Sequence, residues 1–257
     1  IVEINYHIQC QGVAKELNQG LDNGDGNGIA ADGQLHVDEI DSSALLCPAV
    51  GMLRDIYSGS GSSYPEQLTA IGNTLYFAAN DGTNGVELWK SDGTPSGTVM
   101  VKDINSGSSS SSPSYLTAVG NTLYFTANDG TNGYELWKSD GTASGTVMVK
   151  DINSGIDSGY PSDLTAIGNT LFFEANDGLN GRALWKSDGT ASSTVLVADP
   201  FGGSDSSSPL DELTAVGNTL FFEALNTANG WELWKSDGTP SGTVMVKDIN
   251  SGSGSSY

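Results

Sequence analysis

A unit of about 48 residues that occurs four times constrains the fold of this chain more than any other feature. The tripeptide Leu-Thr-Ala recurs at spacings of 48, 48 and 49 residues, starting at Leu68, Leu116, Leu164 and Leu213. A tryptophan keeps the same spacings, at Trp89, Trp137, Trp185 and Trp234. Repeats of this length stack one supersecondary unit several times. The sequence therefore predicts a repeat domain over residues 51–257, with units at about 65–112, 113–160, 161–209 and 210–257.

Each unit contains four short runs that favour β-strands, separated by turn sequences. In the first unit the runs are LTAIG, TLYFAAN, ELWKS and TVMVKDI, and they end at Gly-Asn, Asn-Asp-Gly, Asp-Gly-Thr and a Ser/Gly loop. Four strands in a period of this length are typical of a β-propeller blade. We expect an all-β fold of four four-stranded repeats that form a small propeller. An open stack of blades is the alternative.

One strand is present in excess of these four units. Residues 52–64, MLRDIYSGSGSSY, match residues 245–257, MVKDINSGSGSSY, which hold the fourth strand of the last unit. The match predicts a seventeenth strand at 52–56. Either this surplus strand closes the ring in place of the C-terminal strand, or one of the two copies remains free to pair with another molecule.

The charge of the chain argues against polyanionic partners. The sequence has 31 Asp and Glu against 10 Lys and Arg, a formal net charge of -21, which disfavours nucleic acid and anionic membrane surfaces. No run approaches the roughly 20 apolar residues of a membrane span, so membrane insertion is not expected. Eight basic residues recur at repeat positions and are interpreted as structural partners of nearby carboxylates: Arg54, Lys102, Lys150, Lys247, Lys90, Lys138, Lys186 and Lys235.

The first fifty residues lie outside the repeats and are predicted to form a small separate module. Residues 1–10 alternate, with Val2, Ile4, Tyr6 and Ile8 on one face, as in a half-buried strand. This strand pairs within its own module or is donated to the sheet edge of another subunit. Cys10 and Cys47 bracket a Gly/Asp-rich segment and indicate a disulfide in an oxidising compartment. Two reduced, buried thiols are the alternative.

A stretch inside this module resembles half of a calcium-binding loop. Asp32-Gly33 followed by Glu39 matches the turn glycine and the closing acid of such a loop. The first half does not match, because Gly28 and Ala30 stand where oxygen ligands belong. Acidic and amide side chains cluster upstream instead. A glycine-rich loop with Asx turns and no metal is the alternative.

Two resemblances to known bacterial proteins follow from these motifs. The phrase ELWKSDGTPSGTVMVKDI resembles the ELWxxDGTxxGTxxVxDI repeats of large secreted and cell-surface proteins of bacteria, over about 185 residues, with WKSDGT intact in all four copies. Departures occur at Ala183, Ser193, Ala198-Asp199-Pro200 and 225–227. This resemblance implies an extracellular setting and no particular chemistry. The stretch from Cys10 to Cys47 resembles small bacterial surface modules, which implies Ca²⁺ held by Asp22, Asp25 or Asn27, Asp32 and Glu39.

No catalytic constellation stands out, because each acidic residue of the repeats recurs once per unit, as structural residues do. Asp92 and its equivalents are expected to cap hairpin turns, and Asp55 and its equivalents to bond turn amides or pair across blades, with metal binding by the Asp55 set as the alternative. Trp231 stands at a position that varies between the units, occupied elsewhere by Val86, Tyr134 and Arg182. It is a candidate glycan contact, with edge packing as the alternative.

The sequence therefore favours a non-enzymatic, extracellular structural protein of a bacterial cell surface. We expect it to assemble with itself, into a filament or a layer, by strand pairing that involves the N-terminal strand and the Leu53–Ile56 strand. A carbohydrate-binding or adhesion propeller is the first alternative, and a glycosidase-type enzyme the second. The first residue, Ile1, fits a mature secreted protein without its signal peptide, and equally a chain given without its start.

Overall fold

The structure is a computed structural model that describes residues 52–202 and 210–255. The chain divides into two compact units, Ile1–Met52 and Leu53–Tyr257, and every element described below belongs to the second. The predicted N-terminal strand, the Cys10–Cys47 disulfide and the calcium-loop residues lie outside the described residues. No helix that could cross a membrane occurs in residues 52–202 and 210–255.

Sixteen strands make up the described part of the second unit. The first two repeats form β1 (Glu66–Ile71), β2 (Thr74–Asn80), β3 (Val86–Ser91), β4 (Val99–Lys102), β5 (Ser114–Val119), β6 (Thr122–Asn128), β7 (Tyr134–Ser139) and β8 (Val147–Lys150). The last two form β9 (Ser162–Ile167), β10 (Thr170–Asn176), β11 (Arg182–Ser187), β12 (Val195–Ala198), β13 (Leu210–Val216), β14 (Thr219–Asn226), β15 (Gly230–Ser236) and β16 (Val244–Lys247).

Each repeat folds into one four-stranded antiparallel sheet whose strands follow chain order. We call them the first (β1–β4), second (β5–β8), third (β9–β12) and fourth sheet (β13–β16). The predicted Gly-Asn turns are two-residue hairpins, in which Gly72 has a φ of 57°. That positive φ at the first turn position is what a type II′ hairpin requires. The prediction of an all-β fold with four antiparallel strands per unit is confirmed.

Adjacent residues of the middle strands bury opposite faces of each sheet. In β2, Tyr76 packs with residues of the second sheet, whereas Phe77 packs with Ile56 on the other side. In β3, Leu88 and Trp89 divide in the same way. Because side chains alternate along a strand, a sheet between two others needs apolar residues at consecutive positions. This requirement explains the runs TLYF and ELW in the sequence.

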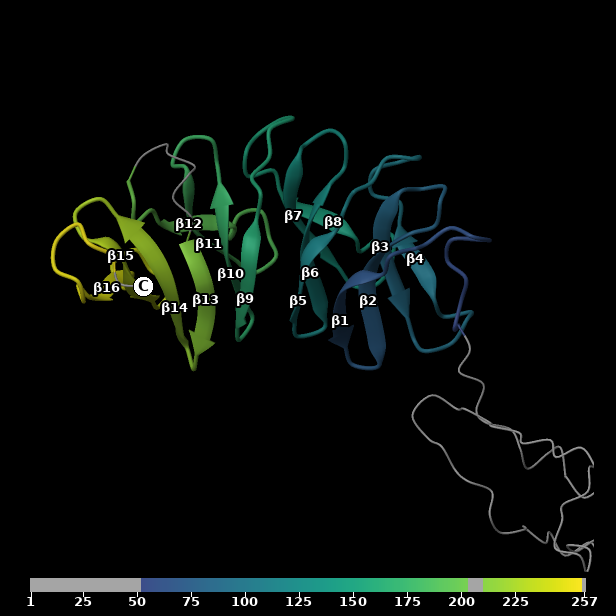
Figure 1. Ribbon diagram of the computed structural model, residues 1–257, viewed down its shortest axis with the longest axis horizontal. Helices are drawn as coiled ribbons and strands as arrows, with labels where there is room; N and C mark the ends of the chain where they lie inside the picture. Colours follow the sequence, from purple (N-terminus) through teal and green to yellow (C-terminus); the bar gives the residue numbers. More distant parts are fainter. Residues whose placement is uncertain (1–51, 203–209, 256–257) are drawn as a thin grey trace, which may run out of the picture. The chain divides into compact units, whose positions relative to one another are not determined.

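The four sheets follow one another in chain order and meet through their first strands. Contacts run from β1 to β5, from β5 to β9 and from β9 to β13 (Figure 1). Among the described residues no comparable contact joins β13 back to β1, and the first and fourth sheets stand at opposite ends of the row. The fold is propeller-like, but the sheets do not close on themselves as the predicted ring would require.

Residues 52–56, predicted to form the surplus strand, do not lie in a strand. The reason is physical: a strand needs a hydrogen-bonded neighbour, and among the described residues no strand precedes β1. The loops that follow residues 52–56 and 245–249 nevertheless share the same hydrogen bond, as their sequence match suggests. The N–H of Gly59 donates to Asp55 at 3.1 Å, and the N–H of Gly252 donates to Asp248 at 3.2 Å.

The recurring aspartates act as turn residues, as predicted. Asp92 Oδ1 accepts from the N–H and the hydroxyl of Thr94, at 2.9 and 2.7 Å. These bonds, the hydroxyl first, hold the pKa of Asp92 below its ordinary value. Asp55 and its equivalents accept from loop amides in the same way; for example, Asp103 accepts from the N–H of Gly107 at 3.1 Å. Both sets therefore hold turns and loops in place.

Candidate interaction surface

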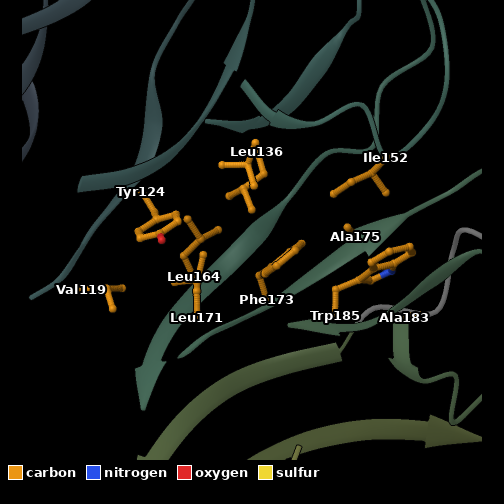
Figure 2. Close-up of a cluster of buried hydrophobic side chains, with 11 residues drawn as sticks. Val119, Tyr124, Leu136, Ile152, Leu164, Leu171, Phe173, Ala175, Ala183 and Trp185 are labelled. Carbon is orange, nitrogen blue, oxygen red and sulfur yellow. The ribbon is translucent and has the colours of Figure 1, made fainter. Parts of the chain in front are cut away.

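The interface between consecutive sheets is built three times from the same repeat positions. One sheet contributes what we call its forward face, and the next sheet its backward face. In the second and third sheets these faces meet as one buried cluster, in which Tyr124 and Leu136 lie opposite Leu171 and Phe173 (Figure 2). The forward face there consists of Val119, Tyr124, Leu136, Val149 and Ile152, and the backward face of Leu164, Leu171, Phe173, Ala175, Ala183 and Trp185.

Lysines of the third strands bond the next sheet. Lys90 Nζ donates to the carbonyl of Gly141 at 2.8 Å, and Lys138 does the same to Gly189. Lys186 donates to Gly238, again at 2.8 Å. The hydrogen-bond acceptors of these lysines are therefore carbonyls, while the charge of Lys90 also favours the ionised forms of the nearby carboxylates Asp92 and Asp140. A carbonyl at a turn of the next sheet offers a fixed acceptor, so each lysine joins two repeats.

Basic residues of the fourth strands make a second set of bonds between sheets. Lys102 Nζ donates to the carbonyl of Thr146 at 2.8 Å and lies 5.7 Å from the ring centroid of Trp137. Lys150 repeats both contacts on the third sheet, with Thr194 and with Trp185 at 5.5 Å. A cation over an indole ring adds a favourable electrostatic contact to the hydrogen bond.

The forward face of the fourth sheet has no covering sheet among the described residues. Leu88, Leu136 and Leu184 are fully buried, but the equivalent Leu233 is 42% exposed. Val246 is 45% exposed and Ile249 is 61% exposed, although the equivalent valines and isoleucines of earlier sheets are buried. Lys235 and Lys247 are exposed as well, whereas their counterparts in the first two sheets are partly covered. The fourth sheet thus exposes the same residue types that are covered in the interfaces between the earlier sheets.

The backward face of the first sheet is only partly covered, and the cover comes from residues 53–64. Arg54 lies over Trp89, with its Cζ 6.0 Å from the ring centroid, and donates to the carbonyl of Thr98. Ile56 packs against Phe77 and Trp89. These are the places that Lys102 and Ile104 take on the second sheet.

Part of that backward face remains open. Leu68 is 62% exposed, while its equivalents Leu116 and Leu164 are 9% exposed. The turn glycine Gly93 is also exposed, whereas Gly141 and Gly189 are buried beneath the preceding sheet. The two ends of the row of sheets therefore carry complementary halves of the repeated interface.

Buried glutamates fix the loop that leaves each forward face. Glu135 is fully buried, and its carboxylate accepts from the N–H groups of Ile152 at 2.8 Å, Gly159 at 2.6 Å and Asn153 at 3.3 Å. Burial raises the pKa of Glu135 to about 7, even though these bonds favour the ionised form. Glu87 has the same arrangement in the first sheet, and burial raises its pKa too.

We expect this raised pKa to make folding stability fall as the pH rises. Between about pH 4.5 and about pH 7 the folded chain holds a proton on Glu135 that the unfolded chain has lost, so stability present below that window disappears across it. Thermal unfolding across this range should shift less in a Glu135→Gln variant than in the wild type. An exposed carboxylate serves as control, and Glu66→Gln should keep the wild-type slope. Equal slopes in all three proteins would contradict the assignment.

The third repeat lacks this glutamate, and the segment that follows its last strand is held by different bonds. Ala183 takes the place of Glu135, and Pro200 takes the place of Ile152, whose N–H the glutamate would bind. The acceptor and the donor are therefore missing together. Glu174, from β10, instead accepts from the N–H of Leu210 at 3.0 Å and forms an ion pair with Arg182. The departures that the sequence displayed at 183 and 198–200 thus belong to one change.

A hollow of about 460 Å³ lies beside this altered repeat. Tyr160, which is largely exposed, stacks on Tyr134 with ring centroids 5.8 Å apart, and Arg182 lines the same hollow. Tyr134 and Arg182 occupy the variable repeat position that the sequence singled out through Trp231. Trp231 itself is half-buried in β15. That variability was the signal that could have located this hollow.

A second hollow, of about 360 Å³, is lined by residues near the start of the first strands. Gln67, Tyr115, Asp163 and Glu212 are equivalent residues that line it, and each has a positive φ at a bulge. Burial, and then the charge of Asp211, raises the pKa of Asp163. Within the described residues no three His, Cys, Asp or Glu side chains are grouped so as to hold a metal ion.

Comparison with known proteins does not assign the chain to a family. No family model matches the chain, and no curated protein matches it. Among solved structures, a puromycin hydrolase S511A mutant complexed with PGG shares 14% identity at a TM-score of 0.49, covering 74% of this chain and 29% of that one. The computationally designed Ika4 protein shares 19% identity at a TM-score of 0.41, covering 72% and 97%. The chain thus spans under a third of the hydrolase, and neither likeness bears on its activity.

Proposed function

We propose that this chain is a non-enzymatic, extracellular structural protein that assembles with itself through the ends of its row of sheets. The observation that carries the proposal is the open forward face of the fourth sheet. Leu233 and Val246 are exposed there, at positions that are buried wherever another sheet follows, and Ile249 is exposed where Ile104 and Ile152 are buried. A contiguous apolar face of this kind marks an interaction site in a water-soluble protein.

The two end faces determine the kind of contact that self-association would use. The forward face of the fourth sheet and the backward face of the first sheet are different surfaces, so contact between them is head-to-tail. Head-to-tail contacts that do not close into a ring produce filaments. The net charge of -21 opposes association at low ionic strength, and salt should therefore favour it.

The other parts of the proposal rest on the sequence. The resemblance of the repeats to those of secreted and cell-surface proteins of bacteria supports an extracellular location. The Ca²⁺ site at Asp22, Asp25 or Asn27, Asp32 and Glu39 and the Cys10–Cys47 disulfide would stabilise the N-terminal module in that setting. Strand pairing by residues 2–8 and by Leu53 and Ile56 is the mode of contact that the sequence suggested.

Sedimentation velocity over a range of concentrations tests self-association directly. The wild type should show larger species as concentration rises, and Leu233→Glu and Val246→Glu should each remain monomeric, because a buried unpaired carboxylate is costly. Val195→Glu is the matched control, since Val195 is 37% exposed on an outer strand away from the end face. A wild type that stays monomeric up to about 1 mM would contradict the proposal.

The alternative function, glycan binding, is favoured by one observation. Tyr160 and Tyr134 offer a stacked aromatic surface beside Arg182 and Asn176, which suits the apolar face and hydroxyl groups of a sugar. Screening on a glycan array would detect such binding. A true site should lose it in Tyr160→Ala and keep it in Tyr115→Ala, which removes an exposed tyrosine elsewhere.

A further inference from the structure

We propose that the open face of the fourth sheet of one molecule packs on the first sheet of a second molecule, in the place now taken by residues 53–64. The contact would reproduce the interface that joins consecutive sheets within the chain. This inference rests on the proposed self-association and adds the identity of both surfaces. It also replaces strand pairing with the packing of one sheet on another.

The donating face has the residue types of the internal interfaces. Phe221, Leu233, Val246 and Ile249 stand where the second sheet has Tyr124, Leu136, Val149 and Ile152. The start of the loop after β16 also makes the same hydrogen bond to a buried glutamate as the equivalent loop of the second sheet. The N–H of Ile249 donates to Glu232 at 3.2 Å, as that of Ile152 donates to Glu135. A preformed face loses little conformational entropy on docking.

The receiving face matches in the same way. Leu68, Leu75, Phe77 and Trp89 stand where the third sheet has Leu164, Leu171, Phe173 and Trp185. Leu68 is largely exposed and Leu75 is partly exposed, although the leucines at these positions in the second and third sheets are buried. The apolar surface left open on this sheet is thus the surface that a preceding sheet covers elsewhere.

The polar groups of the two faces are complementary. Lys235 is an exposed donor without a following sheet among the described residues, and the turn residue Gly93 is exposed without a preceding lysine. Their equivalents, Lys138 and Gly189, bond at 2.8 Å. Lys247 is likewise equivalent to Lys150, which bonds the next sheet's threonine carbonyl and covers its tryptophan. Docking would therefore give both lysines a carbonyl acceptor. Within the chain the bond equivalent to that of Lys235 occurs three times, and the bond equivalent to that of Lys247 occurs twice.

Residues 53–64 block one part of this receiving face. Arg54 and Ile56 hold the places that Lys247 and Ile249 of the second molecule would need, on Trp89, Phe77 and Thr98. The Arg54 side chain and the carbonyl of Ser63, which accepts from the N–H of Asn80 in β2 at 2.9 Å, bond this segment to the first sheet, but the segment forms no strand ladder. In contrast, β16 is paired with β15 through Leu233, Trp234 and Lys235. We therefore expect the segment without a ladder to be displaced. It acts as a competitor, and the measured affinity is the intrinsic one reduced by the fraction of molecules in which it has moved away.

The same pair of substitutions at equivalent positions should therefore have opposite effects. Arg54→Glu with Ile56→Ser loosens the competing segment and should tighten association roughly tenfold in sedimentation equilibrium. Lys247→Glu with Ile249→Ser damages the docking face and should abolish association. Circular dichroism checks that both full-length variants remain folded. If the first variant associates more weakly than the wild type, residues 53–56 are a donated strand and the proposal is overturned.

Photocrosslinking identifies the receiving surface independently. With p-benzoylphenylalanine in place of Leu233, the expected product is a dimer joined to a peptide that contains Leu68, Leu75 or Phe77. A crosslink to another surface, such as a second fourth sheet, would overturn the docking while leaving self-association intact. Absence of association in the wild type and in every variant would overturn the docking and the proposed function together.

Discussion

Replacing Leu136 with alanine should lower the free energy of unfolding by about 2–5 kcal/mol, because the side chain is fully buried between the second and third sheets. The same replacement at Leu233 should cost under about 1 kcal/mol in the monomer, because that side chain already contacts water. The two leucines hold the same position in their repeats. The comparison therefore isolates the contribution of a neighbouring sheet from that of the strand itself.

The measurement needs a concentration at which the chain is monomeric, with urea unfolding followed by tryptophan fluorescence and by circular dichroism. Repeat arrays can unfold in stages, since each sheet contacts only its neighbours. Hydrogen exchange of the amides in β7 and β15 resolves such stages. If Leu233→Ala cost as much as Leu136→Ala in the monomer, the end face would be covered in solution and the open arrangement of sheets would be wrong.

Much of the fold could be predicted because its signals are local. Hairpin glycines such as Gly72, Asx residues such as Asp92 and the alternation in β2 act within a few residues, so the sequence displays them directly. Four copies of the pattern then remove the ambiguity of any single one. The strands, their order and the turns follow from this local chemistry.

Contacts between repeats were harder to predict, because a repeat pattern gives equivalent positions without saying which neighbour each residue meets. Lys90 lies close to Asp92 in sequence, and pairing with a carboxylate was the natural interpretation. The structure instead directs Lys90 to the carbonyl of Gly141, 51 residues away. Residues 52–56 were misassigned for a related reason, since they have the composition of a fourth strand but no third strand precedes them in the part of the chain that the structure describes.

The only sign of the candidate interaction surface in the sequence was one strand sequence more than four repeats need. An extra copy of one strand indicated that the repeats have two unequal ends, yet composition could not say which residues those ends expose. Burial decides that question, because Ile249 and Ile152 have nearly identical sequence surroundings and opposite exposure. The N-terminal candidates, from Val2 to Glu39, lie outside the described residues and stay predictions.

Glu135→Ala should destabilise the chain by about 3 kcal/mol, because three loop N–H groups would lose their acceptor inside the protein. Alanine also leaves the space of the carboxylate unfilled. Glu135→Gln keeps the volume and one acceptor oxygen but turns an amide N–H₂ toward N–H donors, so its cost should be intermediate. Urea unfolding of the three proteins gives the order, and an unchanged free energy of unfolding in Glu135→Ala would show that water replaces the carboxylate without penalty.

The third repeat supplies the reverse experiment. Ala183→Glu restores the repeat consensus, and a sequence-based argument would expect it to stabilise the chain. We expect it to destabilise the chain instead, by several kcal/mol, because Pro200 has no N–H to donate and Ala183 is fully buried. Ala183→Leu at the same position controls for the added volume. A stabilising Ala183→Glu would mean that other amides of the 199–202 segment can reach the new carboxylate, and that the paired loss of glutamate and N–H in this repeat has no structural meaning.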